Sequence, residues 1–418
     1  MGSKRAVLIG CNYPGTKAEL RGCVNDVKRM HDCLVNRFGF SEEDITVLID
    51  TDSSYEQPTG KNIRAALSRL ISSSSPGSGD LLFVHYSGHG TRLPAESGDD
   101  DDTGYDECIV PCDMNLITDE DFRSFVDKVP EGCYITIVSD SCHSGGLIDD
   151  SKEQIGESTN QPQKSSSEES QPSLGFSSIL QNVVGNALET RELNFGLLKP
   201  RHHGHRSREE EEEVVEIPEG GTGNIKSRSL PISTLIEILQ QKTGNQNIDV
   251  GMLRTTLFNL FGDDASPKVQ KFMSVIMTHF AGDQKGGLMG AVGSLATQLF
   301  EQKLDNPSEG YGQSAMKPPV RRQDVHAGSS NRRLPENSVL VSGCQSDQTS
   351  ADATPSGDPS AAYGALSNAI QTILAESDGP VSNQELVSKA REMLKRQGFT
   401  QRPGLYCGDS HVEASFIC

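Results

Sequence analysis

The sequence contains no tryptophan, and it has few aromatic or hydrophobic residues. Aromatic residues make up 5% and hydrophobic residues 34% of its 418 positions. Both shares are below those of typical globular domains, which indicates that folded regions share the chain with polar, loosely structured sequence. The length still allows roughly two or three domains with a sizeable core. We therefore expect a folded protein interrupted by a long linker.

Basic residues and long apolar runs are also scarce. The chain has 38 Lys and Arg against 58 Asp and Glu, a net charge of −20, so it repels phosphate and is not expected to bind nucleic acid. The uncharged, glycine-containing stretch of residues 286–300 is shorter than the roughly 20 residues that a membrane helix needs. Gly2 lacks a myristoylation pattern because Ala6 stands where Ser or Thr is required. We expect no membrane span.

The ten cysteines lack the dense, even spacing of a secreted disulfide scaffold, which predicts reduced thiols and a cytoplasmic protein. Cys108 and Cys112 raise the alternative of a zinc site. They belong to a strand-like run containing Pro111, and the sequence has no second Cys pair with zinc spacing. We interpret them as structural.

The first 150 residues alternate strand-like and helix-like patterns. Apolar runs typical of buried strands are followed by helical periodicity over residues 19–37 and 61–71. The strand-like runs are residues 6–9, 45–49, 81–84, 108–110 and 134–138. Short unbroken runs of this kind suit strands that are covered by helices on both faces. The pattern predicts an α/β fold with a mostly parallel central sheet.

The rest of the chain divides into three regions. Residues 151–228 are rich in Ser, Gln, Glu and Gly and are interpreted as a flexible linker. Residues 229–335 combine helical patterns with polar sequence and are interpreted as a helical insert. Residues 336–418 contain one strand-like run and two helical patterns, so we expect them to complete the sheet.

Two strand ends carry the candidate catalytic residues. His89 lies in His-Tyr-Ser-Gly-His-Gly, and Cys142 lies in Asp-Ser-Cys-His-Ser-Gly-Gly. Parallel strands place their sites at the carboxyl edge, where a thiol and an imidazole could cooperate in acyl transfer with glycine N–H groups on the oxyanion. A cysteine alone is more often a small buried hydrophobe. The separation of 53 positions is close to the caspase interval of about 50, which favours a catalytic pair.

With these motifs the sequence resembles plant metacaspases of type II. The resemblance extends to Asn12-Tyr13, to Leu20-Arg21-Gly22-Cys23-Val24-Asn25-Asp26 and to Ser342-Gly343-Cys344-Gln345. It implies a caspase/hemoglobinase-like fold, a Cys–His dyad, cleavage after Arg or Lys, and self-processing triggered by calcium.

Three aspartates are candidates for binding a basic substrate side chain. Desolvating Lys or Arg without a partner costs several kcal/mol, so such a pocket needs carboxylates. Asp140 is two residues before Cys142, and Asp26 and Asp352 follow other strand-like runs. If these strands adjoin, the three carboxylates meet beside the thiol, and the resemblance assigns the specificity pocket to such positions. Ordinary cap or turn aspartates remain the alternative, above all for Asp352.

Asp99, Asp100, Asp101 and Asp102 are four consecutive carboxylates, an oxygen-rich set that suits calcium. A solvated charge run is the commoner explanation of such a block. Because it follows His89 within about ten residues, and because the resemblance implies calcium activation, we expect Ca²⁺ to act here as an activator and not as a catalytic ion.

Lys226 and Arg228 form a basic island near the end of the linker. Exposed flexible segments are where proteolysis concentrates, so we predict Lys226 as the principal self-cleavage point and Arg228 as the second choice. The intact segment could lie across the acidic pocket as an internal inhibitor. An ordinary basic linker is the alternative.

These observations predict a calcium-activated, self-processing cysteine endopeptidase that acts as a monomer on polypeptides with Lys or Arg at the cleavage point. Cys142 would attack the carbonyl, His89 would handle the proton, and the backbone near Gly90 and Cys142 would stabilise the oxyanion. Two alternatives stay open at this point: a Cys-dependent transpeptidase or ligase, and a calcium-responsive scaffold whose dyad is idle.

Overall fold

The computed structural model describes eight stretches of the chain, and all of them belong to the unit formed by residues 1–159 and 212–418. The stretches are residues 2–94, 105–142, 153–156, 213–217, 221–280, 337–344, 348–355 and 358–417. The candidate calcium ligands Asp99 to Asp102, most of the linker, and residues 281–335 of the insert lie outside them.

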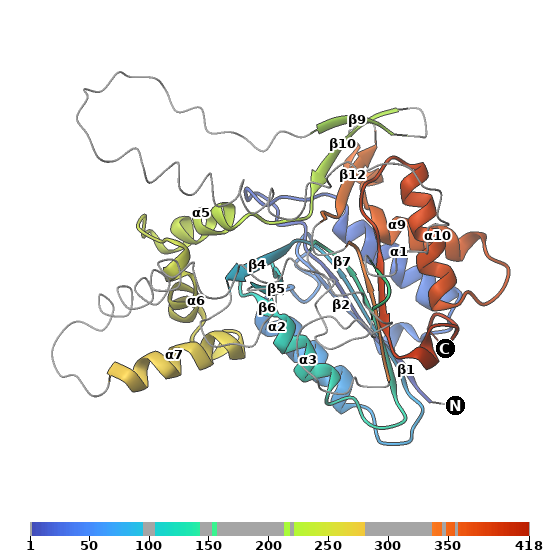
Figure 1. The fold of residues 1–418 in the computed structure, drawn as a ribbon, viewed down its shortest axis with the longest axis horizontal. Coiled ribbons are helices and arrows are strands. Elements are labelled where there is room, and N and C mark those ends of the chain that lie inside the picture. Colours follow the sequence, from blue (N-terminus) through green and yellow to red (C-terminus); the bar gives the residue numbers. More distant parts are fainter. Residues whose placement is uncertain are drawn as a thin grey trace, which may run out of the picture. The chain divides into compact units, whose positions relative to one another are not determined.

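A seven-stranded sheet forms the centre of this unit (Figure 1). Its strands are, in spatial order, β2 (Ile45–Ile49), β1 (Lys4–Gly10), β3 (Leu81–Ser87), β7 (Tyr134–Asp140), β11 (Ser338–Ser342), β14 (Gly404–Cys407) and β8 (Glu153–Ile155). The first five pair in parallel, whereas β14 and β8 pair antiparallel. The mostly parallel sheet expected from the sequence is therefore confirmed, with an antiparallel extension at one edge.

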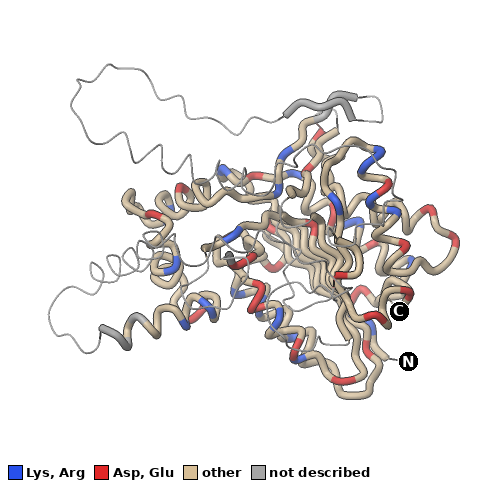
Figure 2. Tube along the Cα trace, viewed as in Figure 1, with Lys and Arg blue, Asp and Glu red and all other residues tan. Residues whose placement is uncertain are grey.

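Helices cover both faces of the sheet because successive side chains along a buried strand point to opposite faces. Helices α1 (Cys23–Asn36), α9 (Ala365–Glu376) and α10 (Asn383–Arg396) cover one face, where Ala6 and Leu8 of β1 are buried. Helices α2 (Gly60–Ser72) and α3 (Asp119–Val126) cover the other, where Val7 and Ile9 are buried. Acidic and basic residues lie mainly along the surrounding helices and loops (Figure 2).

The described residues also form two smaller sheets. One consists of β4 (Gly90–Pro94), β5 (Tyr105–Ile109) and β6 (Ile117–Thr118). The other consists of β13 (Tyr363–Gly364), β12 (Ala351–Pro355), β10 (Gly221–Ser227) and β9 (Glu213–Ile217). Strands β9 and β10 occupy residues that the sequence assigned to the flexible linker. They are ordered because β10 pairs antiparallel with β12, an interaction between distant parts of the chain that local composition does not reveal.

The helical insert packs against the central sheet and its helices. Helices α5 (Ile232–Thr243), α6 (Leu253–Phe261) and α7 (Pro267–Phe280) bury Leu235, Leu257 and Val269 in the same apolar cluster as α2 and α3. Short 3₁₀ turns complete the fold: η1 (Glu42–Asp44), η2 (Val250–Met252), η3 (Gly262–Asp264), η4 (Pro359–Ala361) and η5 (Asp409–His411). None of the helices in the described stretches is long and apolar enough to cross a membrane.

Candidate active site

The predicted thiol and imidazole lie at the ends of two neighbouring strands. Strands β3 and β7 pair in parallel, and Ser87 is opposite Asp140 at their carboxyl ends. His89 follows β3 and Cys142 follows β7, and both side chains are buried. The two segments touch at Gly90, where a Cβ would lie 1.8 Å from the carbonyl oxygen of Cys142. Only glycine permits this approach, which brings the segments that carry the two side chains into direct contact.

His89 is held as a neutral base. Its Nε2 lies 2.8 Å from the carbonyl oxygen of Ala18, which assigns the ring proton to Nε2. Burial lowers the pKa of His89 from 6.5 to about 4, against the hydrogen bond with Ala18, which raises it. At neutral pH the imidazole is therefore uncharged, and its Nδ1 lone pair is able to accept a proton.

Cys142 is held as a neutral thiol. The backbone N–H of Ser350 donates to its Sγ at 2.9 Å. Burial raises the pKa of the Cys142 thiol well above its ordinary value, and the neighbouring thiol of Cys344 raises it further. A protonated, enclosed sulfur is a weak nucleophile, so this arrangement corresponds to a latent site.

The three candidate aspartates converge, and each is fixed by hydrogen bonds. Asp26, in the first turn of α1, accepts from the N–H of Gly364 at 2.9 Å. Asp140, at the end of β7, accepts from the N–H of Ser367 at 2.8 Å. Asp352, on β12, accepts from the N–H groups of Arg21 and Gly22 at 3.0 Å each. All three are at most 2% exposed, so the side chains form a preorganised acidic pocket.

The acidic pocket is occupied by Arg228 of the same chain. Its Nη2 lies 3.0 Å from Asp26 and 2.9 Å from Asp352, and its Nη1 lies 3.4 Å from the Asp140 carboxylate. Nη1 also donates to Ser87 Oγ at 2.8 Å. The side chain is completely buried, and such a cation is tolerable only when carboxylates and hydrogen bonds replace its water shell. Burial raises the pKa of Asp26 to about 6, although the charge of Arg228 opposes that shift.

Lys226 is placed differently. It lies two residues earlier on β10, and its Nζ donates to the carbonyl oxygen of Glu19 at 2.8 Å. Its side chain lines a cavity of about 370 Å³ beside the acidic pocket. The structure thus brings Arg228, not Lys226, to the three carboxylates.

The backbone around Arg228 runs through the site as an extended segment. The Arg228 N–H donates to the carbonyl of Ser350, and the Leu230 N–H donates to the carbonyl of Gly90, each at 2.9 Å. The Gly90 N–H donates to the carbonyl oxygen of Arg228, also at 2.9 Å. A backbone N–H on that oxygen is the arrangement that would stabilise an oxyanion formed there. The Ser227 side chain, in turn, interacts with the Cys142 thiol.

Several contributing residues had no role assigned from the sequence. Ser87 supports both Arg228 and Asp26, Ser350 contacts the thiol, and Ala18 orients the imidazole. Ser87 lies inside the histidine motif, and this position was the one feature of the sequence that pointed to it. Ala18 and Ser350 act through backbone groups, which leave no pattern in the sequence. Within the described ranges, no group of three or more His, Cys, Asp or Glu side chains is arranged to hold a metal ion.

The fold, together with a thiol and an imidazole on adjacent strand ends, defines a cysteine peptidase of the caspase-like class. Residues 3–413 match the family described as Caspase domain. Among curated proteins, the chain is similar to Metacaspase-4 (59% identical over 428 residues), Metacaspase-6 (54% over 422) and Metacaspase-7 (52% over 421), all from Arabidopsis thaliana, with 100% of each chain covered. The chain belongs to this family as a type II metacaspase of the plant kind.

Proposed function

We propose that the protein is a cysteine endopeptidase zymogen that calcium activates, that cleaves its own chain, and that cuts polypeptides after Arg or Lys. The observation that carries this proposal is the placement of Arg228. Its side chain fills the acidic pocket while its carbonyl oxygen accepts a hydrogen bond from Gly90. The chain therefore lies in its own site in the manner of a substrate.

The proposed reaction uses Cys142 and His89 as the catalytic pair. Sγ of Cys142 attacks the carbonyl carbon of Arg228 while Nδ1 of His89 takes the thiol proton. The Gly90 N–H stabilises the oxyanion of the tetrahedral intermediate. On collapse, the C–N bond to Ser229 breaks, and His89 returns its proton to the departing amine. Water then attacks the thioester at residue 228, which releases the new carboxyl terminus and restores the thiol.

Specificity for Arg or Lys follows from the charge of the acidic pocket. A neutral side chain would take the Arg228 cation from three buried carboxylates, of which Asp26 keeps its ion pair with Arg29, and an acidic side chain would add a fourth negative charge. Arginine also donates hydrogen bonds from both of its Nη atoms in the pocket, and a single lysine amine would satisfy only part of these acceptors. Selection of a basic residue at the cleavage point is the expected result.

For self-processing, we place Arg228 before Lys226, which reverses the order of preference drawn from the sequence. Both are basic residues of one segment, so their composition does not separate them. The contacts do, because the carbonyl that accepts from Gly90 belongs to Arg228, and the side chain of Lys226 lies outside the acidic pocket.

Calcium activation is supported by the chemistry and the chain position of Asp99 to Asp102. Carboxylate oxygens are the ligands that Ca²⁺ prefers. These residues belong to the connection between β4 and β5, and β4 begins at Gly90, the oxyanion donor. Calcium bound to these carboxylates would remove their mutual repulsion, and this change would act on the β4–β5 hairpin, which carries Gly90.

The test is to add calcium to the purified full-length chain and to read the new fragment termini by mass spectrometry. We expect a new amino terminus at Ser229, which a calcium chelator or the substitution Cys142→Ala prevents. A terminus at Ser227 would favour Lys226 instead. If calcium yields no fragments, self-processing is refuted. A reporter peptide ending in Arg, with excess amine present, shows by product mass whether water or the amine resolves the acyl-enzyme. Equal turnover by Cys142→Ala would instead favour the scaffold alternative.

A further inference from the structure

Two tyrosine hydroxyls hold the backbone of His89. The N–H of His89 donates to Tyr13 Oη at 2.9 Å, and the carbonyl oxygen of His89 accepts from Tyr86 Oη at 2.7 Å. Both tyrosines are at most 1% exposed. Hydrogen bonds in such a water-free position are stronger than at the surface, and leaving one unmade is costly.

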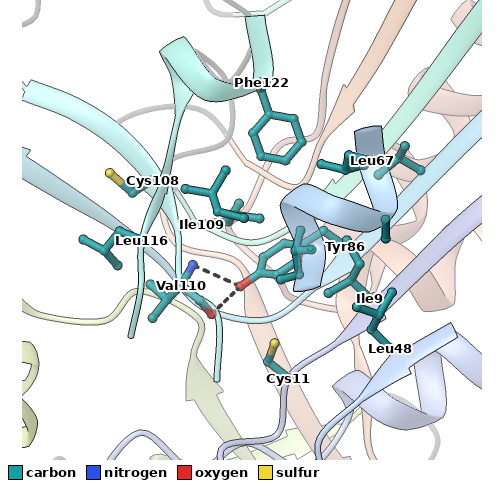
Figure 3. Packing of buried hydrophobic residues seen from close by; sticks show 14 of the residues in the cluster. Ile9, Cys11, Leu48, Leu67, Tyr86, Cys108, Ile109, Val110, Leu116 and Phe122 are labelled. Carbon is teal, nitrogen blue, oxygen red and sulfur yellow. Dashed lines mark hydrogen bonds between the residues drawn. The ribbon is translucent and has the colours of Figure 1, made fainter. Parts of the chain in front are cut away.

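The hydroxyl protons can be assigned without conflict. Tyr13 Oη donates to the carbonyl oxygen of Val110 at 2.6 Å, which leaves its lone pairs for the His89 N–H. Tyr86 Oη donates to His89 and accepts from the Val110 N–H at 3.2 Å. Figure 3 shows the Tyr86 hydroxyl facing the backbone of Val110. Burial raises the pKa of both phenols well above the ordinary value, so both stay protonated and able to donate.

Tyr13 also bounds the imidazole itself. The two ring centroids are 5.0 Å apart with an interplanar angle of 37°. Tyr13 reaches this position with a φ of 51°, in the left-handed region that a bulky residue rarely adopts. The carboxylate of Asp50 accepts from the N–H groups of Asn12 at 2.9 Å and Tyr13 at 2.7 Å, which stabilises that conformation. Strain of this kind persists where surrounding contacts enforce it, typically at functional sites.

The motif around His89 is shaped to admit the two hydroxyls. A Cβ at Gly88 would lie 2.5 Å from Tyr86 Oη and 2.9 Å from Tyr13 Oη. Glycine before His89 therefore lets the tyrosines approach the backbone, and Gly90 after it lets the backbone of Cys142 approach. His89 thus lies between two close contacts, one at each neighbouring glycine.

We propose that Tyr13 and Tyr86 are positioning residues, whose hydroxyls and ring fix the imidazole of His89 against Cys142 during the peptidase reaction. The inference rests on the proposed function, because it assumes that His89 is the base. Small displacements of a catalytic group cost large factors in rate, and a backbone anchored at both its N–H and its carbonyl resists them.

Self-cleavage provides a direct test. Because the Arg228 peptide is already seated in the full-length chain, its first-order cleavage rate after calcium addition reports the chemical step with little contribution from substrate binding. We expect Tyr13→Phe and Tyr86→Phe each to lower this rate about tenfold, the size of one hydrogen bond expressed in the transition state. In turnover of an Arg reporter, kcat should fall while KM stays within twofold.

The matched control is Tyr406→Phe, which removes a buried hydroxyl from β14 of the same sheet, and thermal unfolding identifies any variant that does not fold. Rates within twofold of wild type in a folded Tyr13 or Tyr86 variant would overturn the inference, and so would an equal loss in the Tyr406 control. Tyr13→Ala adds a second readout. Removing the ring admits water to the imidazole, so the pKa of His89 and with it the acidic limb of the pH–rate profile should rise from about 4. An acidic limb that does not move counts against the proposal. An inactive wild type would instead refute the proposed function.

Discussion

The substitution Arg228→Gln tests the acidic pocket most directly. It removes one cation that is 3.0 Å from Asp26, 2.9 Å from Asp352 and 3.4 Å from Asp140, all in a region without solvent exposure. Breaking a buried ion pair by removing one partner typically costs about 3–5 kcal/mol, because the other charge is left uncompensated. We expect a loss of unfolding free energy of that order at pH 8.

The loss should depend on pH with a defined sign. Burial raises the pKa of Asp26 to about 6 in the intact chain, from 3.8, while Arg228 opposes the rise. Without Arg228 the folded-state pKa of Asp26 rises further, so the folded variant takes up a proton at a pH where its unfolded chain remains ionised. The variant therefore gains stability relative to the intact chain as pH falls from 8 to 6, by at most about 1.4 kcal/mol per pH unit for one proton.

The assay is denaturant unfolding at pH 8 and pH 6, with Cys142→Ala in every chain to prevent cleavage. Lys226→Gln is the matched control, since it removes a cation two residues away from Arg228 but outside the acidic pocket, and its effect should stay below about 1 kcal/mol. In chains that keep Cys142, cleavage after residue 228 should vanish in Arg228→Gln and persist in Lys226→Gln. A loss below about 1 kcal/mol at both pH values, or unchanged fragments from Arg228→Gln, would refute this reasoning.

Three further outcomes follow from the structure. Cys142 should react with iodoacetamide at least about tenfold more slowly in the intact chain than after processing, because its thiol is enclosed and protonated. Peptide mass mapping measures the two rates, and equal rates would contradict the latent site. Because the pKa of His89 is depressed in the folded state, the unfolded chain takes up a proton on this residue first as pH falls. The chain with His89 should therefore lose about 1.4 kcal/mol of unfolding free energy per pH unit, relative to His89→Gln, between pH 6.5 and about pH 4. A difference in denaturant unfolding that does not change with pH would show that the ring is solvated. Asp106 is buried between Arg254 and Lys268 of the insert, so Asp106→Asn should cost about 3 kcal/mol of unfolding free energy in the same assay. The control Glu237→Gln, which removes the exposed partner of Lys17, should cost less than about 1 kcal/mol. Similar costs for the two variants would show that Asp106 does not anchor the insert.

Local sequence was sufficient to predict the five parallel strands of the central sheet and the edge at which the site lies, but not the antiparallel strands β14 and β8. Strands β1, β3 and β7 are continuous apolar runs, and His89 and Cys142 directly follow two of them. Parallel strands end at a common edge, so the proximity of the two segments follows from the pattern. The same logic brought Asp26 and Asp140 into consideration.

The placement of Arg228 could not be predicted in this way. Strand β10 reads Gly-Thr-Gly-Asn-Ile-Lys-Ser, which has weak strand propensity and no apolar alternation. It becomes a strand because β12 offers it a partner, and Arg228 meets Asp352 across 124 positions of sequence. Lys226 and Arg228 are equivalent in composition, so only this register distinguishes them. The roles of Tyr13 and Tyr86 were likewise hidden, because they act on backbone groups.

The walls of the acidic pocket include glycine, and this sets a limit on what can enter. A methyl group at Gly364 would lie 2.4 Å from Nη1 of Arg228, and one at Gly22 would lie 2.7 Å from Asp352. A methyl carried on the guanidinium itself would need the same space and would also replace an N–H donor. Under the proposed function, methylation of a substrate arginine would therefore protect that bond from cleavage, although the positive charge is unchanged.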